Sequence, residues 1–144
     1  MGNQWHFGIK AHIGVDADSG LVHTVVGTAA NVSDVTQTSS LVHGEESDVF
    51  ADAGYQGVSK REETQDIDAN WHVAMRPGKR KALDRGTPVG IGHGQLEHVK
   101  ASIRAKVEHP FRVIKRQFGH VKVRDRGLAK STLQLQTQLA LSNL

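Results

Sequence analysis

Apolar and polar side chains alternate along residues 5–15, which is the pattern of a β-strand with one buried face. The apolar positions of this stretch are Trp5, Phe7, Ile9, Ala11, Ile13 and Val15. Residues 16–20 follow with the Asp, Ser and Gly residues that favour a turn, and residues 21–29 are rich in β-branched side chains. The pattern therefore predicts a β-hairpin over residues 5–29.

Shorter elements follow the hairpin up to residue 75. Residues 31–42 combine helix-capping side chains with apolar positions on one helical face, and 49–51 are a short apolar run that ends at Asp52. The stretch from Ser59 to Glu62 has the form of a capping box and predicts a short helix, and residues 71–75 predict another strand. This order of elements predicts an α/β fold with a mixed sheet and helical crossovers.

The amino-acid composition of the chain changes after residue 75. Residues 76–94 are basic and rich in glycine and proline, which predicts a mobile loop. From Leu96 to Phe118 apolar residues recur every three or four positions, which predicts a long helix that Pro110 kinks or breaks. Residues 128–144 predict a last helix. We therefore divide a single domain, 1–144, into a strand-rich acidic part (1–75), a basic loop (76–94) and a helical basic part (95–144).

The two halves of the chain carry opposite charge. Residues 1–75 contain 3 Lys/Arg and 11 Asp/Glu, whereas residues 76–130 contain 15 Lys/Arg and 4 Asp/Glu. A basic half of this density suits either a nucleic-acid backbone or an ordinary solvated face. The chain has no cysteine, which excludes disulfides and thiolate metal sites. It also has no apolar run near the ~20 residues of a membrane helix, so we expect a cytoplasmic protein without membrane contact.

Two groups of residues are candidates for chemistry. Asp52 stands at the end of a predicted buried strand, where ligands collect in open α/β sheets, although a lone Asp there more often caps the turn or the next helix. On the long helix, Glu108 lies about 40° and Lys115 about 20° around the axis from Arg104, so the three side chains share one face. They also suit a plain row of surface charges. The nine histidines have no ligand pattern, and we expect them on the surface.

Three stretches, Gly2–Gly8, Phe50–Gly57 and Val107–Gly119, closely resemble bacterial insertion-sequence transposases of the insertion sequence 4 and insertion sequence 5 type. The resemblance implies a ribonuclease-H-like fold in which two Asp and one Glu bind two divalent ions, Mg²⁺ or Mn²⁺. The signature of the family around its Glu is Tyr, two residues, Arg, three residues, Glu, six residues and Lys. Arg104, Glu108 and Lys115 match it, whereas Ala101 stands at the Tyr position.

The resemblance also implies a role for individual residues. Asp52 matches the second Asp and Glu108 the Glu, so both are the expected catalytic metal ligands, and Arg104 and Lys115 are expected to contact phosphates. The implied reaction is cleavage and strand transfer of double-stranded DNA at transposon terminal repeats and a target, by a nucleoid-associated protein that self-associates as a dimer. Further expected DNA-binding residues are basic side chains at Lys79, Arg80, Lys81, Arg112, Arg116, Lys122, Arg124 and Arg126.

The strand that carries the first Asp in this family has no counterpart here, so we expect a catalytic domain truncated at the N-terminus and inactive alone. Asp16 and Asp18 do not replace the missing ligand, because they lie in the hairpin turn, at the opposite end of the expected sheet. We expect the carboxylates of Asp52 and Glu108 within about 10 Å of each other, close enough to share metal ions ~4 Å apart. The alternatives are a DNA-binding remnant without catalysis and a pseudogene product.

Overall fold

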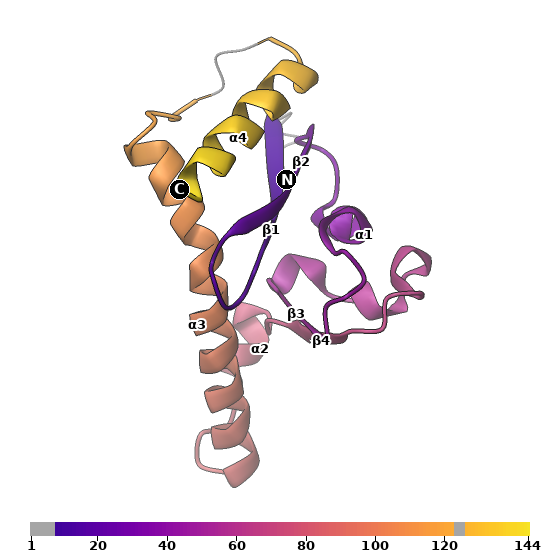
Figure 1. Cartoon of the computed structure of the whole chain (residues 1–144). Coiled ribbons are helices and arrows are strands. Elements are labelled where there is room, and N and C mark those ends of the chain that lie inside the picture. The colour runs from indigo at the N-terminus through magenta and orange to yellow at the C-terminus, as the bar shows by residue number, and fades with distance from the viewer. Residues whose placement is uncertain (1–7, 123–125) are drawn as a thin grey trace, which may run out of the picture.

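A computed structural model describes residues 8–122 and 126–144, and its first element is the predicted hairpin (Figure 1). β1 (Ile9–Val15) pairs antiparallel with β2 (Val22–Ala29), with Ile9 opposite Ala29. The Asp16 carboxylate closes the turn by accepting the backbone N–H of Ser19 at 2.6 Å. Of the predicted strand, Trp5 and Phe7 lie outside the described residues.

Each face of the hairpin packs against a different part of the chain. Ala11 and Ile13 face a core formed by Ile114, Leu135 and Leu139. On the other face, Lys10 and His12 meet the segment after β2, which holds the 3₁₀ turn η1 (Asp34–Gln37) and the short helix α1 (Thr38–Leu41). The helix predicted over 31–42 is thus one 3₁₀ turn followed by one α-helical turn.

The second pair of strands forms its own sheet. β3 (Asp48–Ala51) and β4 (Asn70–Val73) are parallel and are joined by three 3₁₀ turns, η2 (Ala53–Tyr55), η3 (Val58–Lys60) and η4 (Glu62–Thr64). The predicted single mixed sheet is wrong for the described residues, where β1 pairs only with β2 and β3 only with β4.

The helix predicted at Ser59 is also wrong. The left-handed backbone of Gly57 (φ 82°) leads directly into η3, and no side chain caps that turn. The Thr64 hydroxyl instead donates to the carbonyl oxygens of Val58 and Arg61, at 2.5 Å and 3.2 Å. These bonds hold the segment in successive 3₁₀ turns, because they engage carbonyl groups that a continuous helix would use within itself.

The predicted loop over 76–94 is largely helical. α2 spans Pro77–Lys81, and the long helix α3 spans Pro88–Arg116. α3 begins early because Thr87 caps it by accepting the Gly90 N–H at 3.1 Å and Pro88 occupies its first turn. The helix continues through Pro110, so a break there is excluded, and the alternative of a kink stays a prediction. Its N-terminal end projects beyond both sheets (Figure 1).

The predicted last helix is confirmed as α4 (Leu128–Ser142). It packs on β2 and beside the C-terminal part of α3, where Leu135, Leu139 and Ile114 are almost completely buried. The Asn143 side-chain amide accepts the N–H of Val22 at 3.0 Å and donates to its C=O at 2.8 Å. Gln136 donates to the carbonyl of Val25 at 3.3 Å. The C-terminal helix is therefore tied to the edge of the hairpin.

Candidate functional site

Asp52 follows directly after β3, as the sequence predicts. One carboxylate oxygen accepts the N–H of Gly54 at 2.6 Å, so Asp52 caps η2. The other oxygen lies 3.9 Å from the Arg104 guanidinium, and the Asp52 side chain is 58% exposed. Capping thus uses only one oxygen, and the second remains accessible at the carboxyl end of a strand.

α3 is fixed beside this strand end by a buried ion pair that the sequence analysis missed. Glu97 accepts the Met75 N–H at 2.8 Å, and Lys100 donates to the Val73 carbonyl at 3.1 Å. The two side chains contact each other at 2.9 Å and are 4% and 13% exposed. Glu97 and Lys100 thus bind α3 to the end of β4, next to β3. The sequence held one indication of this role for Glu97, because it lies seven residues before Arg104 and hence on the same helical face as the candidate residues.

Glu108 lies one turn beyond Arg104 on α3, about 6 Å along the helix axis. Its side chain is exposed and lines a hollow together with Phe111, Arg112, Lys115 and Arg116. The structure therefore brings Glu108 and Lys115 together on one face, as the spacing predicts. The approach of Glu108 to Asp52 stays a prediction.

Further polar side chains surround Asp52. A Cβ atom on Gly54 would lie 3.1 Å from an Asp52 oxygen and 3.6 Å from an Asp34 oxygen, so both carboxylates approach one point. Lys10 contacts Asp34 at 3.1 Å. Burial, with the nearby charges of Asp34 and Asp52, raises the pKa of Tyr55 to about 12, so its phenol stays protonated.

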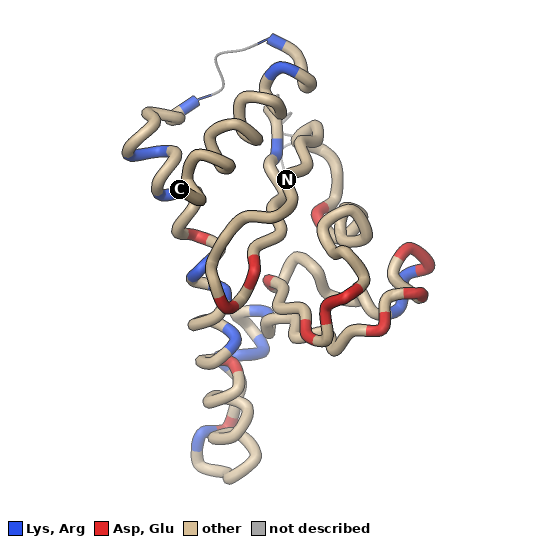
Figure 2. The backbone as a smooth tube through the Cα atoms, in the orientation of Figure 1, with Lys and Arg blue, Asp and Glu red and all other residues tan. Residues whose placement is uncertain are grey.

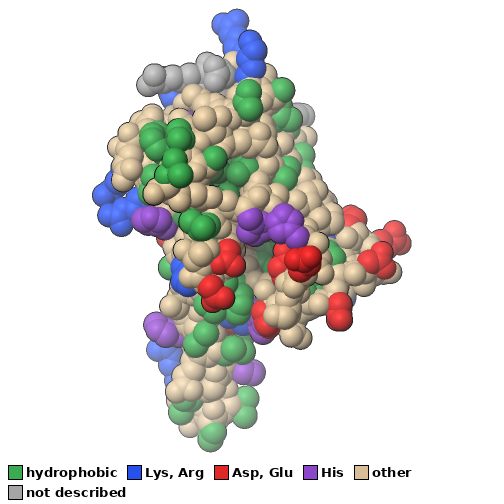
Figure 3. Space-filling model, in the orientation of Figure 1, with side chains coloured by type: hydrophobic (Ala, Val, Ile, Leu, Met, Phe, Trp, Pro, Cys, Tyr) green, Lys and Arg blue, Asp and Glu red, His purple; other side chains and the backbone are tan. Residues whose placement is uncertain are grey.

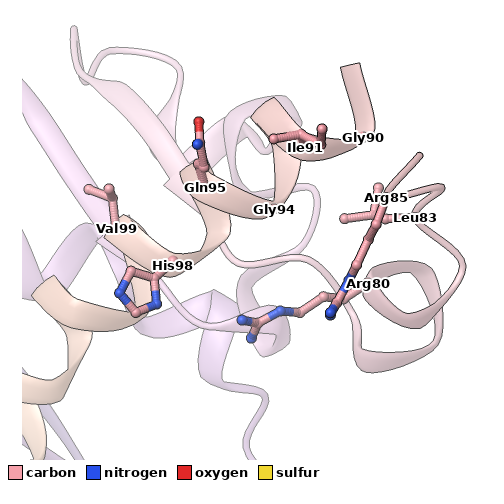
Figure 4. A pocket seen from close by; sticks show the side chains of 9 residues that line it. All are labelled: Arg80, Leu83, Arg85, Gly90, Ile91, Gly94, Gln95, His98 and Val99. Atoms are coloured by element: carbon pink, nitrogen blue, oxygen red, sulfur yellow. The ribbon is translucent and has the colours of Figure 1, made fainter. Parts of the chain in front are cut away.

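Most of the residues expected to bind phosphate belong to α2 and α3, whose backbone carries many of the Lys and Arg positions (Figure 2). Acidic residues gather instead along the segment that leads to β4. A hollow between the α2–α3 connection and α3 is lined by Arg80, Arg85 and His98, with Leu83 and Val99 beside them (Figure 4). Lys122 and Arg126 flank the connection to α4, and Arg124 lies outside the described residues. We name as the basic surface the exposed side chains of Lys79, Arg80, Lys81, Arg112, Lys115 and Arg116.

Comparison with known protein families decides the identity. The transposase DDE domain family matches residues 2–144, which is nearly the whole chain. The chain belongs to this transposase family. Its enzymes act on DNA and generally use divalent metal ions. No solved structure matched the chain.

The candidate carboxylates suit such ions only in part. Carboxylates are the ligands that Mg²⁺ and Mn²⁺ prefer, and Asp52 and Glu108 both offer exposed ones. Among residues 8–122 and 126–144, however, no three histidine, cysteine or acidic side chains gather where they could hold one ion. The described part of the chain thus brings Asp34 and Asp52 near each other but adds no third such ligand to them.

One prediction about the histidines is wrong. His12 is only 5% exposed, and its ring shares a 2.7 Å hydrogen bond with the Thr28 hydroxyl. Burial lowers the pKa of His12, although Asp34 acts in the opposite direction. It occupies a polar position of β1, but that face is covered by η1 and α1 and not by solvent. No helix in the described part of the transposase is long and apolar enough to cross a membrane.

Proposed function

We propose that this chain supplies metal ligands and DNA contacts for cleavage and strand transfer at transposon ends, as a transposase of the insertion sequence 4 and 5 type. The observation that carries the proposal is the contact between Arg104 of α3 and Asp52 at the end of β3. This contact links the strand that bears one proposed ligand to the helix that bears the other, Glu108.

Asp52 and Glu108 are the proposed ligands of the divalent ion. When bound, such an ion activates the attacking water or 3′-hydroxyl and stabilises the leaving oxygen of the phosphodiester. Both side chains are exposed, so a phosphate group has access to them. Lys115 lies two turns beyond Glu108 and lines the same hollow, where it would contact a neighbouring phosphate.

Arg104 would couple metal binding to DNA binding. Its guanidinium lies 3.9 Å from Asp52 and neutralises part of the carboxylate charge, a role that a bound divalent cation would take over. Arg104 is then repelled by that cation and free to bind a phosphate oxygen, for which its planar donors are suited. DNA affinity should therefore rise when Asp52 is loaded with metal.

The proposed fold is a ribonuclease-H-like domain whose sheet is interrupted between β1 and β3. Two observations support it. Within the described residues each of these strands has one pairing partner, which leaves its other edge available for a further strand. Helices also cover both faces of the hairpin, α4 on one and α1 on the other. Asp52 at the carboxyl end of β3 is then a ligand position typical of open α/β sheets.

Titration with Mn²⁺, measured by calorimetry, tests the ligand assignment. Asp52→Asn and Glu108→Gln should each weaken Mn²⁺ binding, because each removes one anionic oxygen ligand. Asp66→Asn, at an exposed acidic position of the segment before β4, is the matched control and should bind like the wild type. Equal affinity in all four proteins would refute the assignment.

Cleavage assays separate the proposal from its alternative, a DNA-binding protein without catalysis. The alternative is favoured by the lack of a three-ligand group among the described residues. Metal-dependent nicking of a duplex that carries the terminal repeat, lost in Asp52→Asn, would support catalysis. Binding of the same duplex without nicking, together with Mn²⁺ affinity that does not depend on Asp52 and Glu108, would select the DNA-binding function.

A further inference from the structure

We propose that His23, His43 and Thr24 form a second cation site, separate from the Asp52 region, that binds a divalent transition metal such as Zn²⁺ or Ni²⁺. His23 and Thr24 belong to β2, and His43 follows α1. The site thus joins two segments that lie 20 residues apart in sequence.

Three donor atoms converge in this place. His23 Nδ1 lies 2.7 Å from His43 Nε2 and 2.9 Å from the Thr24 hydroxyl oxygen, which is 3.3 Å from His43 Nε2. Ligands at about 2.1 Å from a metal ion are separated by roughly 3.0–3.4 Å in octahedral or tetrahedral geometry. The 2.9 Å and 3.3 Å distances are therefore close to the separation of two ligands on one ion, and the 2.7 Å distance between the two nitrogens needs to open by only about half an ångström.

The side chains are free to make this adjustment. Both histidines are exposed, and their rings are tilted by 53° with centroids 4.6 Å apart. At present the two nitrogens share one hydrogen. When a metal ion binds, the ring that donates this hydrogen would carry it on its other nitrogen, so both facing nitrogens become lone-pair donors. Neither neutral ring loses a proton in this change, because only the tautomer of that ring differs.

The local charge favours a cation. Glu46 is fixed beside the site by the backbone N–H groups of His43 and Gly44, at 2.7 Å and 2.8 Å. Its carboxylate would offset part of the metal charge without leaving its place.

The donor set defines the kind of ion. Imidazole nitrogen selects borderline ions such as Zn²⁺, Ni²⁺ and Cu²⁺, whereas Mg²⁺ prefers an all-oxygen shell. No group of three histidine, cysteine or acidic residues is present in the described chain, so water must complete the shell. The ion should therefore exchange readily. Figure 3 shows histidine side chains beside one another on an open face, next to acidic ones.

Calorimetric titration of the tag-free full chain with Zn²⁺ alone and with Ni²⁺ alone tests the proposal, at a pH near 7.5. The wild type should bind one ion that Mg²⁺ does not displace. His23→Ala and His43→Ala should each raise the Kd by about tenfold or more. His98→Ala, at an exposed histidine of α3, is the matched control and should leave the Kd unchanged.

A second measurement needs no variant. Paramagnetic Cu²⁺ at substoichiometric amounts should broaden the amide NMR signals of Thr24 and Gly44 before those of α3. Broadening that begins at His93 or His98 would overturn the assignment. So would unchanged Zn²⁺ affinity in both His23→Ala and His43→Ala. Because Zn²⁺ also binds carboxylates, the two ligand tests are separated by their variants: His23→Ala and His43→Ala report on this site, and Asp52→Asn and Glu108→Gln report on the other.

Discussion

Replacing Glu97 with Ala should detach the long helix α3 from the end of β4. The substitution removes the acceptor of the Met75 N–H and the partner of Lys100, two interactions at 2.8 Å and 2.9 Å. The Lys100 ammonium would keep only its bond to the Val73 carbonyl. Arg104 lies one turn further along α3, so its contact with Asp52 should loosen as well.

The size of the effect follows from burial. Loss of one partner from a buried ion pair costs about 3–5 kcal/mol. Lys100 is 13% exposed, so water compensates part of its charge and the lower end applies, about 3 kcal/mol. The pKa of Glu97 is lowered, as expected for a carboxylate in an ion pair. Burial alone would raise this pKa, but the hydrogen bond from the Met75 amide and the charge of Lys100 outweigh it, so the carboxylate is ionised in the fold.

Urea unfolding of four proteins measures this free energy. Glu97→Gln keeps an acceptor for Met75 and should lose only about 1–2 kcal/mol. Glu97→Leu combined with Lys100→Met replaces the pair by apolar side chains and should recover much of the stability lost in Glu97→Ala. If Glu97→Ala lies within about 0.5 kcal/mol of the wild type, α3 is not held by this pair and the argument fails.

Three other predictions concern single features of the chain. Gly90→Ala should destabilise the fold by about 2 kcal/mol or more, because its Cβ would lie 1.8 Å from the Asp84 carbonyl oxygen. The Cβ of Gly92→Ala meets nothing within 4 Å, so this control should stabilise the helix. Equal free energies of unfolding for the two variants would contradict this prediction. Because the pKa of His12 is below its ordinary 6.5, the unfolded chain binds more protons, so the free energy of unfolding should fall as the pH drops below 6.5 and be retained above it. His12→Asn should flatten that dependence between about pH 5 and 7, and an unchanged slope would show that other groups cause it. Replacing 79–81 with Ala should reduce the slope of log DNA affinity against log salt from near −4.5, the value for about five phosphate contacts; an unchanged slope would place the DNA elsewhere.

Elements defined by local periodicity were predictable from the sequence. The alternation around Ala11 and Ile13 identifies the hairpin and its buried face, and the apolar run before Asp52 identifies β3. The start of the long helix within 76–94 was not predictable, because four glycines in the second half of this region favour a loop by composition. The Thr87 cap and the proline that follows it determine the start of α3 instead. Local capping outweighs intrinsic propensity there.

The candidate site was predictable only where one element carries it. Asp52 at a strand end and Glu108 in its place on α3 follow from the chain itself. The approach of Asp34 to Asp52 and the burial of Glu97 depend on how η1 and α3 pack against the strands, which no short-range pattern specifies. The separation of the strands into two sheets could not be predicted for the same reason, since strand pairing between distant segments depends on tertiary contacts.

The amide of Asn143 has a consequence for solubility. By taking both backbone groups of Val22, it occupies hydrogen-bonding positions to which a strand from another molecule could add. Gln136 does the same at Val25. Edge strands that keep such groups free are templates for intermolecular β-pairing and fibre growth. The C-terminal helix and Asn143 therefore protect the β2 edge of the hairpin from aggregation, and a chain that loses its last residues would expose backbone groups at that edge to pairing with another molecule.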